Sequence, residues 1–202
     1  DSLRGGFPSR GVCRDEPKMK SEVMGMADLP DYERYPVSEE EMGKRYRNWT
    51  EALSRFVVTL YRVGKEVGGE AFVDRLKDEF YRQGKKGAHM WMALSGSSPE
   101  DFKDCLGLPK LQDTIDDSFA NFWDGYVENT PRAFEKELKT CPVARIWSRE
   151  PDLCEVLLGA SLAGMLEELN PAFVTEGFSE LLTKGDPVCR FRVELKGRGD
   201  EG

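Results

Sequence analysis

Hydrophobic residues recur at helical spacing after Ser38, whereas the first 37 residues show no such period. One run of three- and four-residue steps ends at Gly64, and its members are Tyr46, Trp49, Leu53, Phe56, Val57, Leu60 and Val63. A second run starts near Gly69 and comprises Phe72, Val73, Leu76 and Phe80. Because this spacing gathers apolar side chains on one side of a helix, it predicts two long helices that pack along their stripes.

Shorter elements follow. Ser98-Pro99 is typical of a helix start, and a further helical pattern contains Leu111, Ile115, Phe119, Phe122 and Trp123. We expect a strand within 126–140 and short helices at 142–149 and 152–168. Residues 188–195 alternate between apolar and polar, with Cys189, Phe191, Val193 and Leu195 on one side. This alternation predicts a strand that forms an antiparallel hairpin with the run 172–182.

The pattern divides the chain into three parts of one compact domain. Residues 1–37 are rich in glycine and proline, which predicts an irregular arm. Residues 38–123 form a helical region, and residues 124–202 an α+β region that contains three of the five cysteines. We therefore predict an α+β fold in which a helical N-terminal layer packs on a C-terminal antiparallel sheet with short helices.

The net charge and the cysteine content limit the classes of binding partner and cofactor that we expect. The chain of 202 residues has 29 basic and 37 acidic side chains, a net charge of −8, which argues against binding nucleic acid or anionic lipid. No apolar stretch approaches the roughly 18 residues of a membrane-spanning helix. Five widely spaced cysteines without a CxxC motif favour reduced thiols, a cytoplasmic location and no metal or other cofactor. The chain begins with Asp1, so a removed targeting segment is compatible with the sequence.

Cys141 is the strongest candidate for chemistry. It precedes Pro142, and proline favours the first position of a helix, so the thiol is predicted to lie at a helix start. Free N–H groups there stabilise a thiolate and lower its pKa toward neutrality, and Arg145 adds positive charge one turn away. Cys154 and Cys189 are expected to line the same cavity, although unpaired cysteines also serve as small core residues.

His89, the single histidine, is a candidate general base beside Cys141. A packed or surface histidine is the alternative. Asp116, Asp117 and Asp124 form an acidic face that we interpret as solvated rather than as a cation site. Cys13 and Cys105 are interpreted as structural or incidental.

The C-terminal region resembles a known family. The motifs are Cys141-Pro142-Val143-Ala144, Pro151-Asp152-Leu153-Cys154, Leu169-Asn170-Pro171 and Lys184-Gly185-Asp186-Pro187-Val188-Cys189-Arg190-Phe191. Over about residues 120–196 they resemble the signature of L-2-amino-thiazoline-4-carboxylate hydrolase-like proteins. The resemblance implies a cytoplasmic, bacterial-type enzyme that opens a small cyclic C–N bond, with Cys141, Cys154 and Cys189 at the family's cysteine positions. After Cys154 the chain departs from the family pattern, which has an acidic residue about three positions further on. The ending also resembles vinyl-reductase-type ligand-binding domains.

These observations predict a hydrolase with Cys141 and His89 as catalytic residues and with Cys154, Cys189 and Arg145 as substrate-binding residues. A module that binds a small ligand or a metal through the same thiols is the alternative. A third hypothesis is a subunit of a larger complex, with the arm 1–37 holding a neighbouring copy in a homo-oligomer.

Overall fold

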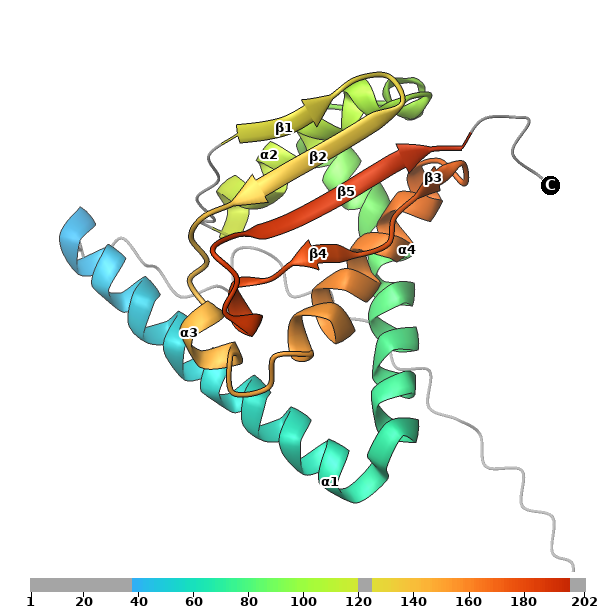
Figure 1. Ribbon diagram of the computed structural model, residues 1–202. Helices are drawn as coiled ribbons and strands as arrows, with labels where there is room; N and C mark the ends of the chain where they lie inside the picture. The colour runs from blue at the N-terminus through green and yellow to red at the C-terminus, as the bar shows by residue number, and fades with distance from the viewer. Residues whose placement is uncertain (1–37, 120–124, 197–202) are drawn as a thin grey trace, which may run out of the picture. The chain divides into compact units, whose positions relative to one another are not determined.

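The structure is a computed structural model that describes residues 38–119 and 125–196. The arm 1–37, with Cys13, and the residues Phe122, Trp123 and Asp124 lie outside these ranges. Helix α1 (Glu39–Leu94) contains both predicted long helices, and a kink at Gly69 separates them. Gly69 has φ 56° and ψ −146°, a backbone conformation open to glycine and strained for other residues. The sequence thus specifies a bend rather than one straight helix (Figure 1).

The chain after α1 contains the shorter elements. Two 3₁₀ turns (Pro99–Phe102 and Cys105–Gly107) lead into α2 (Leu108–Phe119). The hairpin β1 (Gly125–Asn129) and β2 (Ala133–Leu138) is followed by the single turn α3 (Ala144–Trp147). A π-helical turn (Glu155–Gly159) continues into α4 (Ala160–Leu169). Strands β3 (Phe173–Val174) and β4 (Phe178–Glu180), a 3₁₀ turn (Leu182–Lys184) and β5 (Cys189–Leu195) complete the described part.

The five strands form one antiparallel sheet with the order β1-β2-β5-β3, and β4 also pairs with β5. Strand β5 is central, and Phe134 of β2 lies opposite Val193. Strands β3 and β4 return along β5, which confirms the hairpin predicted for residues 172–195. The α+β fold class predicted from the sequence is therefore confirmed.

Helices cover one face of the sheet (Figure 1). One core cluster joins Ala88 of α1, Leu111 of α2 and Met165 of α4 to Phe134 and Phe191 of the sheet. A second cluster lies between the two halves of α1, α3 and the π-helical turn, and it includes Val58, Tyr61, Val73, Trp147, Cys154 and Cys189. The opposite face of the sheet is charged: Arg190 pairs with Glu137 at 2.7 Å, and Arg192 pairs with Glu135 at 2.8 Å. Within the described ranges, no helix is long and apolar enough to cross a membrane.

The stripe on the first half of α1 does not pack as the sequence analysis expects. Ser54, Val58 and Tyr61 form the buried side of this helix, whereas Trp49 is 68% exposed and Phe56 is 59% exposed. Helical periodicity identifies an apolar stripe, but it cannot tell which surface covers that stripe. In the described part of the chain, most of this stripe faces outward.

The prediction of a solvated acidic face on α2 is also partly wrong. Asp116 is only 2% exposed and forms a buried ion pair with Lys136 of β2. Lys136 shares the inward face of its strand with Phe134, a position that alternation assigns to an apolar residue. Asp116 is therefore an internal partner of a lysine, while Asp117 is exposed.

Candidate functional site

Cys141 lines a cavity of about 390 Å³ between the first half of α1 and the loop that joins β2 to α3. Helix α1 contributes one wall, because residues one turn apart face the same direction. The lining residues are Gly43, Tyr46, Arg47, Thr50, Glu51, Thr140, Cys141 and Pro142. The lining combines an aromatic ring, a thiol and a proline with a few polar groups, a composition typical of small-ligand pockets.

The electrostatics of Cys141 differ from the prediction. The backbone N–H groups of Val143 and Ala144 donate to its sulfur, as expected for a helix start, and they act to lower the pKa of the thiol. Burial outweighs them and raises the pKa of Cys141 above the ordinary value of a thiol. The predicted shift toward neutrality is therefore wrong, because the sequence shows the N–H donors but not the burial. At neutral pH the sulfur is a thiol and a weak nucleophile.

The raised pKa of Cys141 predicts how the reaction rate of its thiol depends on pH. Among Cys105, Cys141, Cys154 and Cys189, only Cys141 is not fully buried, so iodoacetamide will label it first. The rate at pH 7 will be below that of the same cysteine in urea, and it will rise as pH increases beyond the ordinary thiol range of about 8.5. Peptide mass spectrometry over a pH series measures this. Rapid labelling of Cys141 that is already maximal at pH 6 would contradict it.

Cys154 and Cys189 lie in the core next to Cys141. Both belong to the same buried cluster, and the N–H of Leu182 donates to the sulfur of Cys189 at 3.3 Å. Burial, and then the proximity of Cys141 and Cys189, raises the pKa of Cys154 to about 12. The fold thus brings together three sulfur atoms that are far apart in the sequence. Two of them are packed in the interior, and only Cys141 reaches the cavity.

These thiols are not arranged around a metal. In the ranges that the structure describes, no three histidine, cysteine or acidic side chains form a group that could hold a metal ion. The three sulfur atoms are thus near enough to influence each other's ionisation without sharing a coordination sphere. The hypothesis of metal binding through the same thiols has no support in this geometry.

Arg145 and His89 have different surroundings. Arg145 is exposed and pairs with Glu51 of the cavity wall at 2.8 Å, so it lies at the rim of the Cys141 cavity. His89 is on the other half of α1, beyond the Gly69 kink, and is 3.3 Å from Glu168 of α4. It does not line the cavity, and the structure does not form the predicted pair of Cys141 and His89.

Tyr46, Arg47 and Thr50 are cavity residues that sequence reasoning missed as a site. Tyr46 belongs to the predicted apolar stripe, for which the pattern indicates packing and not a binding site, while Arg47 and Thr50 carry no motif. Thr50 is one helical turn from both Tyr46 and Arg47, so the three side chains share one side of α1. That face becomes a wall only because the loop containing Cys141 packs against it.

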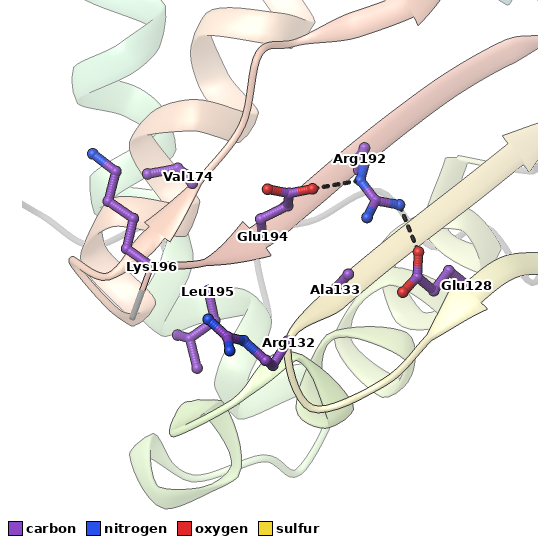
Figure 2. Close-up of a pocket in the computed structure, with 8 residues that line it drawn as sticks. All are labelled: Glu128, Arg132, Ala133, Val174, Arg192, Glu194, Leu195 and Lys196. Carbon is purple, nitrogen blue, oxygen red and sulfur yellow. Dashed lines mark hydrogen bonds and ion pairs between the residues drawn. The ribbon is translucent and has the colours of Figure 1, made fainter. Parts of the chain in front are cut away.

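A second cavity, of about 430 Å³, lies at the end of the sheet near the β1–β2 turn (Figure 2). Arg192 points between two carboxylates, at 2.6 Å from Glu128 and 2.8 Å from Glu194. The other residues that line this second cavity are Arg132, Ala133, Val174, Leu195 and Lys196. Since Arg192 is already engaged in ion pairs with Glu128 and Glu194, we interpret this cavity as part of the charged sheet face rather than as the functional site.

Comparisons with known proteins show a likeness of fold. No family model matches the sequence, and no curated protein matches it. Among solved structures, the chain is similar to a trafficking protein particle complex subunit 3 from Naegleria fowleri, which was crystallised covalently bound to palmitic acid. The TM-score is 0.56 at 11% identity, and the match covers 77% of this chain and 97% of that one. The chain therefore has the α+β fold of that trafficking-complex subunit over nearly the subunit's whole length.

Proposed function

We propose that this protein is a binding module for a small apolar ligand of the fatty-acyl type, with the Cys141 cavity as the binding site. The observation that supports this proposal most directly is a cavity lined by a cysteine in a fold that, in another protein, holds palmitic acid covalently. A cavity of about 390 Å³ is within the range of roughly 300–1,000 Å³ for ligand pockets. Fold alone transfers architecture and not activity, so the cavity residues must supply the specificity.

The residues have complementary roles in this proposal. Tyr46 and Pro142 provide apolar surface for an acyl chain, and Arg47 offers a cation to a free carboxylate. The Cys141 sulfur is the position for covalent attachment. In that reaction the thiolate attacks the carbonyl of an acyl-coenzyme A, the coenzyme A thiolate leaves, and a thioester remains on Cys141. Because burial raises the pKa of Cys141, acyl transfer is expected to be faster at pH 9 than at pH 7.

Binding is tested with fatty acids of increasing chain length, by calorimetry on the full chain. Each methylene that enters the cavity adds about 0.8 kcal/mol, roughly a fourfold gain in affinity, until the cavity is filled. Thr50→Trp fills the cavity and should weaken binding at least about tenfold. Lys77→Trp, which introduces the same side chain at an exposed position of α1, is the control. Equal binding by both variants would rule out this cavity as the site.

Covalent attachment is measured separately by incubating the protein with palmitoyl-coenzyme A and recording its intact mass. The wild type should gain one acyl group that hydroxylamine removes. Cys141→Ser should not gain that group, although it should still bind free palmitate. Acylation of another cysteine would refute the assignment to Cys141 while leaving the cavity proposal to the calorimetric result.

Hydrolysis of a thiazoline ring is the second candidate, and the proximity of Cys141, Cys154 and Cys189 is the observation that favours it. It would require a base other than His89, since that side chain pairs with Glu168 instead of lining the cavity. Turnover of 2-amino-thiazoline-4-carboxylate by the wild type but not by Cys141→Ser would establish the hydrolase. Undiminished turnover in that variant would exclude Cys141 as its nucleophile.

A further inference from the structure

The first half of α1 carries a long exposed apolar stripe, which we call the α1 stripe. Its members are Met42, Tyr46, Trp49, Leu53, Phe56, Leu60, Val63 and Val67, and each is between 40% and 85% exposed. The stripe spans a helix length of roughly 38 Å. A continuous exposed apolar surface of this extent marks an interaction site. The exposed apolar residues of an ordinary protein surface are scattered singly and do not form an aligned stripe.

The spacing within the α1 stripe identifies the kind of partner. The steps alternate four, three, four, three, four, three and four residues, which is the heptad pattern of a coiled-coil seam. An isolated amphipathic helix on a globular core needs no such strict alternation. The core-facing side of the same helix, with Ser54, Val58 and Tyr61, lies outside the seam. The α1 stripe therefore has the geometry to receive another helix.

The order of side chains along the seam is self-complementary when two copies run antiparallel. Leu53 then lies opposite Phe56 of the second copy, and Trp49 opposite Leu60. The outer layers pair Tyr46 with Val63 and Met42 with Val67. Each layer places a larger side chain opposite an aliphatic one, and all eight residues find partners in a single register. Such reciprocity is what a two-fold symmetric interface requires.

Charges beside the seam favour the same orientation. Arg45 and Glu66 both lie on its g-type flank and both are exposed. Antiparallel pairing brings Arg45 of one copy next to Glu66 of the second copy at both ends of the seam. Arg45 already pairs with Glu41 of its own helix at 3.0 Å. Parallel pairing would place Arg45 near Thr50 of the second copy and would add no opposite charge across the interface. The middle of the flank contains Ala52 and Thr59, which are small enough to allow close approach.

We propose that the first half of α1 is a self-association surface, through which two copies of this chain form an antiparallel helical dimer. This interface differs from the hypothesis that the arm 1–37 holds a neighbouring copy, and it stands independently of the proposed ligand. Tyr46 belongs both to the α1 stripe and to the Cys141 cavity. The second copy would therefore border the cavity beside Tyr46, so the dimer would complete its wall.

The test is sedimentation equilibrium of the full chain, with Leu53→Glu as the disrupting variant. This change places two carboxylates in the central layers and should weaken the dimer at least about 100-fold. Leu53 is 47% exposed, so the fold should persist, which circular dichroism and thermal unfolding verify. Asn48→Glu adds the same charge at an exposed position outside the seam and is the control. A monomeric wild type, or a dimer that survives Leu53→Glu, would overturn the proposal.

Orientation is tested by charge exchange. Arg45→Glu places like charges together at both ends and should weaken the dimer roughly tenfold, and adding Glu66→Arg should restore it. A parallel dimer would show no recovery in the double variant, because the two positions would not meet. Occupation of the α1 stripe by residues 1–37 or by an unlike protein would give a monomeric wild type and would likewise contradict self-association.

Discussion

Replacing Lys136 with methionine is expected to lower the free energy of unfolding by about 3–5 kcal/mol, because it leaves the Asp116 carboxylate buried without its cation. Both side chains of this ion pair are almost completely buried, at 2% and 3% exposure. A charge of this kind cannot recover its hydration inside the core. Burial lowers the pKa of Lys136 to about 7, so the lysine is fully a cation only below that pH. The loss is therefore measured at pH 6, as a shift of the urea unfolding midpoint, with the slope of the transition as the check on the denatured state.

The double variant Asp116→Leu/Lys136→Met separates the cost of an orphaned charge from the value of the pair. It should be within about 1–2 kcal/mol of the wild type, since well-packed apolar residues often replace a buried ion pair without loss. Lys184→Met is the exposed control, because Lys184 pairs with Glu155 at 2.8 Å where both are over 40% exposed. It should cost less than about 1 kcal/mol. Similar losses for Lys136→Met and Lys184→Met would show that burial does not determine the effect.

Replacing Gly164 with alanine should destabilise the protein by about 1–3 kcal/mol through a backbone clash. A Cβ atom at Gly164 of α4 would lie 2.0 Å from the carbonyl oxygen of Tyr81, and one at Gly84 of α1 would lie 1.9 Å from that of Ser161. Because each glycine lacks a side chain, the backbone of the other helix can approach it closely. Neither carbonyl belongs to a flexible side chain, so α1 and α4 must move apart to make room.

Gly87→Ala is the matched control for this close approach, since Gly87 lies in the same helix as Gly84. A Cβ there meets nothing nearer than Trp91, at 3.8 Å. Alanine favours a helix over glycine, so this variant should gain about 0.5–1 kcal/mol while Gly164→Ala and Gly84→Ala lose stability. Thermal unfolding of the three variants compares them directly. If all three behaved alike, the close crossing of α1 and α4 would be wrong.

Much of the fold follows from local patterns along the chain. Alternation in residues 188–195 predicts the buried face of β5, since successive strand residues point to opposite sides. The two helical runs and the glycines between them predict the two halves of α1. The same patterns do not predict the burial of Lys136, because an alternation rule recognises apolar residues and cannot identify a lysine whose carboxylate partner is on another element.

The candidate site was less accessible to sequence reasoning. Cys141 could be singled out because Pro142 signals a helix start, and the N–H groups of Val143 and Ala144 do point to its sulfur. The direction of its pKa shift could not be obtained in this way, because burial depends on α1, which lies far away in the sequence. The intrinsic acidity of an imidazole makes His89 a candidate base, yet the bend at Gly69 separates its half of α1 from the half that forms the cavity.

The sequence by itself determined where helices and strands form and which of their residues share a face, since both depend on the fixed periods of the backbone. It also determined that the first half of α1 carries an apolar stripe. Only the tertiary structure decided that this stripe faces outward, that Asp116 meets Lys136 and that Cys141 opens into a cavity. Each of these depends on which surfaces come into contact, and contact between distant segments leaves no trace in local periodicity.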